Sequence, residues 1–268
     1  MLVIRRLEKR FALRRGGEPV SVLAGIDLEI GKGELFCLLG ASGCGKSTLL
    51  NILAGFEPVS AGEITLDGAP ITRAGRDRVV CFQNADAALF PWLTAEENVG
   101  FGLRVQGLDR ARRAPAVERY LRLVGLWDDR QKFPRQLSGG MKQRIQIARA
   151  LAIDPAILLM DEPFAALDAI TRRLMHGELL RIWAATGKTI VFVTHDVSEA
   201  LILADRIGVM TRGPAARLKA VLPIELPRPR DPGDPRFAAA YGRVEALLMP
   251  ETAPQPPETA PQPPETST

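Results

Sequence analysis

Short apolar runs alternate with longer segments of helical periodicity along most of this chain. The runs are bounded by glycine, proline or polar turn residues, a pattern that predicts β-strands. They lie at residues 35–39, 63–68, 78–82, 157–160 and 189–193. Segments with helical spacing follow several of them, so the pattern predicts an α/β fold.

The N-terminal part of the chain follows a different pattern. Residues 2–11 and 21–30 both have strand-like patterns, and the turn-rich stretch 14–19 separates them. Neighbouring strands joined by a short polar turn usually pair antiparallel. We therefore expect an N-terminal antiparallel β-subdomain ahead of the strand at 35–39.

A long helical block follows the first strands. Residues 94–136 have helical spacing, with Thr94 or Asp109 as candidate N-caps. Pro115 interrupts this block, and we expect it to be the first residue of a restarted helix, where a proline is tolerated. The block predicts an α-helical subdomain, about 84–152, inserted into the sheet domain.

The C-terminal part separates into an ordered extension and a repeat. Within the extension, about 211–250, we expect two strands in 218–226 and a final helix at 235–248. The proline-rich stretch 251–257 is then repeated at 258–264. Such a polar repeat cannot bury a core, so we expect residues 251–268 to be disordered or extended. The domain itself would then cover residues 1–250.

Composition narrows the function classes. Hydrophobic residues make up 46% and charged residues 25%, which is ordinary soluble composition, and no apolar run is long enough to span a bilayer. The net charge of +4 is scattered and aromatics are only 6%, which favours a solvated basic face over a nucleic-acid groove. The three cysteines are odd in number and not spaced as zinc ligands, which indicates a reduced cytosolic compartment.

A glycine-rich loop lies between the strand at 35–39 and a helix expected at 48–55. It fits the pattern G-x-x-x-x-G-K-[S/T], in which backbone N–H groups close around phosphate oxygens at a helix N-terminus. Lys46 would place its charge beside the β- and γ-phosphates, and the Ser47 hydroxyl can ligate Mg²⁺. The residues of this predicted phosphate loop are Gly40, Ala41, Ser42, Gly43, Cys44, Gly45, Lys46, Ser47 and Thr48.

Polar residues follow three of the predicted strands, where α/β sheets place their ligands. Asp161 and Glu162 end one strand: we expect Asp161 to bind Mg²⁺ directly or through water, and Glu162 to orient or deprotonate the attacking water. Gln83 can reach Mg²⁺ or a water with its amide carbonyl. His195 can donate to a γ-phosphate oxygen, whereas His176 is expected to be a surface residue.

A second anion cradle is predicted at the start of another helix. Ser138 can cap this helix, while Gly139 and Gly140 leave its first N–H groups bare. Taken alone, the same residues also fit an ordinary helix cap. The apolar residues at helical spacing behind it, expected to face the core, are Met141, Ile145, Ala148 and Ala152.

Three other features each allow a functional interpretation. Phe11 ends the first strand, where its ring could stack on an adenine or could belong to the core. The apolar stretch 89–93 in a polar loop fits either local packing or contact with a partner. Cys44 lies near a helix N-terminus, where thiolates are favoured, so we expect it to react with maleimides and to be shielded by Mg-ATP.

Together these motifs resemble the nucleotide-binding subunit of an ABC transporter, in that family's order from the phosphate loop to His195. The stretches 89–92, 167–172 and 234–237 are similar to importers for nitrate, sulfonates and taurine. The resemblance implies a P-loop NTPase domain of the ABC type that binds ATP with Mg²⁺. It also implies a head-to-tail homodimer with Asp168 in a dimer loop, in which Ser138, Gly139 and Gly140 face the other subunit's ATP. Phe11 stands where the family often has an adenine-stacking tyrosine.

The same resemblance implies a function. The chain would hydrolyse ATP to power an importer, bound peripherally at the cytoplasmic face of a bacterial inner membrane. Its partners would be permease subunits, with residues 84–100 as the contact, and indirectly a solute-binding protein, but no nucleic acid. The alternatives are a soluble ABC ATPase acting on DNA or ribosomes, and a regulatory module that holds ATP. The single cassette and the short gap between the phosphate loop and Ser138 argue against the former, and Glu162 with His195 against the latter.

Overall fold

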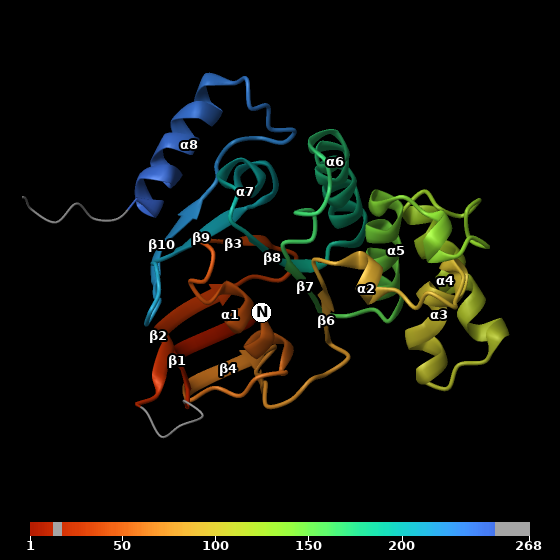
Figure 1. The fold of residues 1–268 in the computed structure, drawn as a ribbon, viewed down its shortest axis with the longest axis horizontal. Helices are drawn as coiled ribbons and strands as arrows, with labels where there is room; N and C mark the ends of the chain where they lie inside the picture. The colour runs from red at the N-terminus through yellow and green to blue at the C-terminus, as the bar shows by residue number, and fades with distance from the viewer. Residues whose placement is uncertain (13–17, 250–268) are drawn as a thin grey trace, which may run out of the picture.

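The computed structural model describes residues 1–12 and 18–249 of the chain. The repeat expected at 251–264 lies outside this described part. Two sheets and a group of helices make up the fold, which confirms the predicted α/β class with an antiparallel β-subdomain and a helical subdomain (Figure 1). Within the described ranges, no helix combines the length and the apolar character needed to cross a bilayer.

The central sheet has six strands in the order β10-β9-β3-β8-β7-β6. Its strands are β3 (Leu35–Leu39), β6 (Arg78–Cys81), β7 (Ile157–Asp161), β8 (Thr189–Thr194), β9 (Arg206–Met210) and β10 (Leu218–Pro223). The neighbours from β9 to β6 run parallel, and β10 pairs antiparallel with β9. Strands β3 and β8 are buried along their whole length, because both faces of the sheet are covered.

The second sheet is antiparallel and has the order β2-β1-β4-β5. Its strands are β1 (Leu2–Phe11), β2 (Val20–Ile30), β4 (Ala61–Leu66) and β5 (Ala69–Pro70). Helix α1 (Lys46–Ala54) lies between the two sheets. One hydrophobic cluster joins α1 to inward-facing residues of both sheets, including Phe36 and Leu38 of β3. The phosphate loop that leads into α1 is therefore fixed between two rigid layers.

The opposite face of the central sheet is covered by helices. Alternate residues of β3, such as Leu35 and Cys37, point to this face and join a larger cluster with the helices that follow. The covering helices are α5 (Gly139–Ala152), α6 (Ala169–Thr186), α7 (Val197–Leu203) and α8 (Pro235–Leu248). The catalytic edge predicted from sequence therefore lies where β3, β7 and β8 end, between α1 and these helices.

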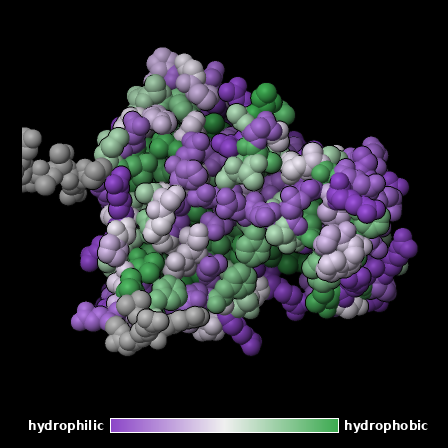
Figure 2. Space-filling view, viewed as in Figure 1, coloured by the Kyte–Doolittle hydropathy of each residue, from purple (hydrophilic) through white to green (hydrophobic). Residues whose placement is uncertain are grey.

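The helical subdomain projects to one side of the sheets (Figure 1). It contains α2 (Ala85–Ala88), α3 (Ala95–Val105), α4 (Arg110–Leu123), the 3-10 helix η1 (Pro134–Gln136) and α5. Thr94 caps α3 through a capping box with Glu97, and Asp109 caps α4. The outer surface of this subdomain is mostly hydrophilic in Figure 2.

Pro115 does not begin a helix, so that expectation was wrong. Helix α4 starts at Arg110 and continues through Pro115 to Leu123. The proline removes the hydrogen bond to the Ala111 carbonyl, but both residues are exposed, so water can satisfy that carbonyl. Solvent on this face makes the interior proline tolerable.

The C-terminal extension forms one strand rather than the two expected in 218–226. After β10, the Ile224 N–H donates to the Asp205 carbonyl oxygen at 2.9 Å. The carbonyls of Ile224 and Leu226 accept from the buried Arg230 guanidinium, which also binds the carbonyls of Leu201 and Ala204. These two carbonyls are therefore bonded to a side chain, and not to a neighbouring strand. Asp234 then caps α8.

Candidate functional site

The phosphate loop joins the end of β3 to the start of α1. Gly43 and Gly45 have φ angles of +78° and +94°, which favour glycine. A Cβ on Gly45 would also lie 2.9 Å from Leu23 Cδ2, closer than real side chains come. No side chain caps the N-terminus of α1. Its first N–H groups can therefore bind an anion.

Lys46 is buried at this helix start, with 5% of its surface exposed. Its ammonium donates to the carbonyl oxygens of Gly40 at 2.8 Å and Ala41 at 3.0 Å. The Glu162 Oε1 atom lies 3.9 Å from the same nitrogen. An ammonium has three N–H donors, so one of them can still bind a phosphate oxygen. The carbonyl oxygens of the phosphate loop thus hold the Lys46 ammonium in place.

Asp161 ends β7 next to the Ser47 hydroxyl. Burial raises the pKa of Asp161, while the hydrogen bond with Ser47 opposes that shift. Its Oδ1 atom is buried and has no hydrogen-bond partner among the described residues. A buried carboxylate oxygen beside a hydroxyl fits Mg²⁺, which prefers oxygen ligands and often takes only one or two from the protein. No cluster of three or more His, Cys, Asp or Glu in the described part of the chain offers a larger metal cage.

Glu162 and His195 come together from the ends of β7 and β8. Glu162 Oε1 and His195 Nδ1 are 3.1 Å apart, and the Glu162 side chain is 20% exposed. Glu162 has a φ angle of +43°, a rare conformation for a residue with a side chain. Its N–H donates to the Val193 carbonyl oxygen at 3.0 Å, which ties the strained residue to β8. Strain of this kind often occurs at functional sites.

Gln83 and Phe11 are both exposed side chains. Gln83 follows β6 and Phe82, whose backbone N–H and carbonyl bind the buried Gln146 amide at 3.2 and 3.1 Å. Phe11 is 39% exposed, so it is not a core residue; that interpretation was wrong. The Lys9 ammonium lies 4.6 Å from the centre of its ring. Whether Phe11 stacks on an adenine stays a prediction.

The second cradle starts α5, in the helical subdomain. The Ser138 hydroxyl accepts from the Met141 N–H at 3.3 Å. A Cβ on Gly140 would lie 3.0 Å from Thr171 of α6, so this turn packs closely on α6. Asp168 caps α6 through the N–H groups of Ile170 and Thr171, and the hydrogen bonds from Thr171 chiefly lower its pKa. Figure 1 shows α1 and α5 on opposite sides of β6 and β7.

The structure overturns the expectation for Cys44. Its side chain is 2% exposed, and burial raises the pKa of its thiol even though Lys46 and nearby N–H groups lower it. The sulfur points toward Gly40, where a Cβ would come within 2.8 Å of it. The thiol is therefore inward-facing and protonated at neutral pH, not a reactive thiolate.

The expectation for His176 was also wrong. It is 7% exposed on α6, not a surface residue, and its Nε2 atom lies 2.8 Å from Glu199 Oε1. Sequence reasoning missed Glu199 altogether. Its one local signal is the spacing from Asp196, which caps α7 three residues earlier. That spacing predicts a helix start but not a buried carboxylate.

Comparisons with known proteins agree with this fold. The ABC transporter family profile matches residues 23–165. Nitrate import ATP-binding protein NrtD of Synechococcus elongatus is 46% identical over 89% of this chain and 87% of its own length. Bicarbonate transport ATP-binding protein CmpC of the same species is 48% identical over 85% of this chain but only 34% of its own length. A dimeric ATP-binding cassette bound to ADP and Pi, in a post-hydrolysis state, is 30% identical and superposes with a TM-score of 0.70 over 84% of this chain and 100% of its own.

Proposed function

The chain belongs to the ABC transporter family, whose ATP-binding cassettes hydrolyse ATP, and from this premise we propose that it powers the import of a small solute through a partner permease. The single observation that carries the proposal is the cluster of Lys46, Glu162 and His195 around the start of α1. A soluble ATPase acting on DNA or ribosomes is not favoured, because the similar proteins are named as transport subunits.

ATP binding is assigned to the phosphate loop. The β- and γ-phosphates would lie at the bare N-terminus of α1, where the N–H groups and the helix dipole favour an anion. Lys46 would add the charge that balances them. Phe11 would offer its exposed ring to the adenine.

Ser47 and Asp161 would hold Mg²⁺, because their oxygens are adjacent and Asp161 Oδ1 has no partner among the described residues. When bound, this ion neutralises charge on the phosphate oxygens. Gln83 would reach the same region from the end of β6. Its exposed position allows it to move with the loop that follows.

Hydrolysis is assigned to Glu162 and His195. Glu162 would take a proton from the attacking water, whose oxygen bonds to the γ-phosphorus as the bond to ADP breaks. His195, with Nδ1 held 3.1 Å from Glu162, would donate from its other ring nitrogen to a γ-phosphate oxygen. The α1 N-terminus and Lys46 would stabilise the negative charge of the transition state.

A second copy of the chain would complete the site. The Ser138–Gly140 turn lies in the helical subdomain, away from α1 of its own chain. Placed across a head-to-tail dimer, its N–H groups would face the partner's γ-phosphate. Ile170 and Leu174 are 77% and 70% exposed beside the Asp168 cap. An apolar surface at this position supports an interface between copies.

The permease contact is assigned to residues 84–100. Trp92 within this range is 70% exposed, and the neighbouring Phe82 is 48% exposed. The subunit would bind at the cytoplasmic face of a bacterial inner membrane, with a solute-binding protein acting on the other side. The names of the relatives suggest nitrate or bicarbonate as the transported solute, with sulfonates and taurine as further candidates.

The proposal is tested by the concentration dependence of ATP hydrolysis. If each site needs two chains, the turnover per chain rises with protein concentration and then levels off as dimers form. Addition of vesicles that contain the permease should change this turnover when the solute-binding protein and nitrate or bicarbonate are supplied. Turnover per chain that is constant down to the lowest concentration measured would contradict the dimeric site, and an absence of hydrolysis would contradict the function.

A further inference from the structure

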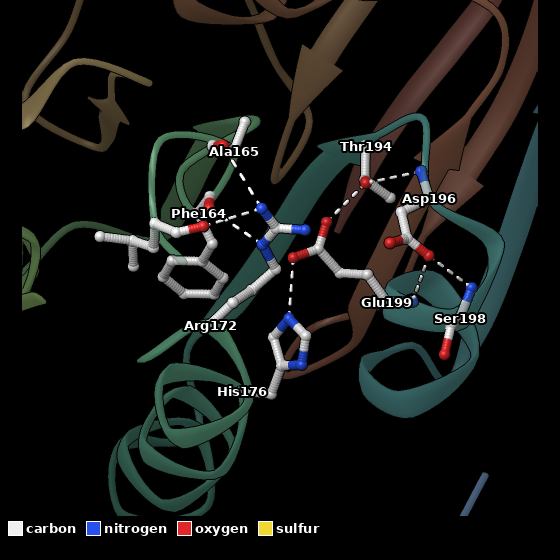
Figure 3. Close-up of polar contacts among 9 residues, drawn as sticks. Phe164, Ala165, Arg172, His176, Thr194, Asp196, Ser198 and Glu199 are labelled. Atoms are coloured by element: carbon white, nitrogen blue, oxygen red, sulfur yellow. Dashed lines mark hydrogen bonds and ion pairs between the residues drawn. The ribbon is translucent and has the colours of Figure 1, made fainter. Parts of the chain in front are cut away.

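A chain of hydrogen bonds among buried side chains borders the same small cavity as Glu162 and His195. Figure 3 shows the residues of this chain. It begins at His176 on α6, whose Nε2 atom lies 2.8 Å from Glu199 Oε1. The other carboxylate oxygen of Glu199 accepts from the Thr194 hydroxyl at 2.5 Å. The Thr194 oxygen in turn accepts from the Asp196 N–H at 3.0 Å. The chain therefore reaches the backbone on both sides of His195.

The donor and acceptor roles in this chain are fixed by chemistry. The Asp196 N–H can only donate, so the Thr194 oxygen accepts from it and points its own proton at the Glu199 carboxylate. Glu199 is 6% exposed, and a buried carboxylate needs such donors. Removal of the Thr194 hydroxyl would break both bonds and leave Glu199 short of a donor. The loop that carries His195 would lose the hydrogen bond between the Asp196 N–H and the Thr194 side chain.

Helix α6 holds the second loop of the site as well. Arg172, one turn before His176, donates to the carbonyl oxygens of Phe164, Ala165 and Leu167 at 3.2, 3.4 and 2.8 Å. These carbonyls belong to the segment between Glu162 and Asp168. One helix thus fixes the segment after Glu162 through Arg172 and the segment around His195 through His176 (Figure 3).

A small cavity joins this network to the site. It has a volume of about 70 Å³ and is lined by Glu162, Ala165, Arg172, Thr194, His195, Asp196 and Glu199. Glu199 and Thr194 therefore share a cavity wall with Glu162 and His195. No layer of packed side chains among the described residues separates Thr194 from His195, so a displacement of the Thr194 hydroxyl would also displace His195.

We propose that Thr194, Glu199 and His176 form a positioning network that holds the His195 ring in place beside Glu162. ATP turnover then depends on three residues that do not touch the nucleotide. This inference rests on the proposed function. The network acts on the geometry of the γ-phosphate site and leaves the phosphate loop unchanged. Its loss should lower kcat and leave the affinity for ATP as it was.

The first test compares variants at Thr194 and His176. T194V keeps the shape and removes the hydroxyl, and we expect kcat to fall by about 10- to 100-fold, since small misplacements at a reacting centre have effects of this size. T194S restores the hydroxyl and should restore most of the turnover. H176L should behave like T194V, and H176Q, whose amide can still donate to Glu199, should recover. S198A is the matched control, because the Ser198 hydroxyl lies outside the network (Figure 3).

The second test is a double-mutant cycle with His195. If Thr194 acts only through His195, T194V added to H195A should lower kcat no further. A purely structural role would instead show the same loss in both backgrounds, with a matching fall in thermal stability and in ATP affinity.

These outcomes separate the two proposals. Wild-type turnover in T194V and H176L, or an additive loss in the cycle, would overturn the positioning network while ATP hydrolysis by the wild type stands. An absence of hydrolysis in the wild type would instead count against the proposed function. T194V that loses turnover, keeps its ATP affinity and adds nothing to H195A would establish the network.

Discussion

We assign a phosphate-binding role to two helix N-termini in this molecule, and they differ in what surrounds them. The start of α1 has a buried lysine, two carboxylates at the end of β7 and a histidine from β8 nearby. The start of α5 has Ser138 and two glycines, and its next cation, Lys142, is paired with Asp86. The first cradle holds its chemistry in one chain, whereas the second offers only N–H groups and a hydroxyl.

This difference indicates which helix start binds the triphosphate and which one completes the site. A site that has a charge, a base and metal ligands can bind a triphosphate alone, but its γ-phosphate remains open to water. A turn of N–H groups with no charge of its own adds specificity only when it is brought to a phosphate that is already held. We therefore propose that the α1 cradle of one chain is completed by the α5 cradle of another.

The largest expected effect is that of E162Q, which acts only on the first cradle's chemistry. Replacing the carboxylate removes the general base but keeps the shape, so turnover should fall by about 10³-fold. ATP should still bind, and dimers should accumulate in gel filtration with Mg-ATP. Unchanged turnover would show that Glu162 is not the base.

The next effect contrasts the two cradles directly. K46A removes a charge-assisted bond to phosphate and should weaken ATP binding to the single chain by about 10- to 100-fold. S138R, in the second cradle, should leave that binding within about twofold and abolish turnover. Titration of dilute protein with a fluorescent ATP analogue measures both. If S138R weakened ATP binding as much as K46A, the two cradles would belong to one site in one chain.

A smaller effect is expected at Asp161, in the absence of nucleotide and metal. Burial raises the pKa of this carboxyl, so the folded chain keeps its proton to a higher pH than the unfolded chain does. Its contribution to stability is lost as the pH rises from the ordinary carboxyl range through the raised value. D161N should thus melt about 2 °C above the wild type at pH 7.

This difference should narrow as the pH falls toward the ordinary carboxyl pKa, where the wild-type side chain is also neutral. Mg-ATP should reverse the order, because only the carboxylate can serve the ion well. Melting curves at pH 5 and pH 7, with EDTA or with Mg-ATP, test both statements. A wild type more stable than D161N at pH 7 in EDTA would contradict the assigned burial effect.

The smallest expected effect concerns the three cysteines, for which we expect no reaction with maleimide in the native protein. Cys37, Cys44 and Cys81 are buried, and burial raises the pKa of Cys81 to about 12. Maleimide should therefore label none of them in the native protein, with or without Mg-ATP, and all three after denaturation. Mass spectrometry counts the labels. Rapid labelling of Cys44 that Mg-ATP suppresses would contradict this prediction and would support a reactive thiol in the phosphate loop.

Features encoded in contiguous residues could be predicted from the sequence. The strand, glycine loop and helix around Lys46 follow one another in the chain, and the caps at Thr94, Asp109 and Ser138 depend on residues three positions away. Their geometry depends on backbone hydrogen bonds within a few residues. The local spacing of residue types was therefore sufficient to predict these helices, their caps and the phosphate loop.

Features that depend on contacts between distant elements could not be predicted. The burial of Cys44 is produced by packing between the two sheets, and that of His176 by α7, which supplies Glu199. Proximity to a helix N-terminus favours a thiolate at Cys44, but desolvation by burial has the larger effect on the pKa of this thiol and raises it. In the same way, the exposed face of α4 that tolerates Pro115 is a tertiary property.

The most direct test of the shared site mixes two variants that each lack one cradle. In an E162Q background, K46A removes the first cradle and S138R blocks the second, so neither protein alone should retain ATP through gel filtration. A mixed head-to-tail dimer has one site with both cradles intact, and we predict about one ATP retained per two chains in that fraction. A mixture that retains no more ATP than either protein alone would contradict a nucleotide held between two copies of the chain.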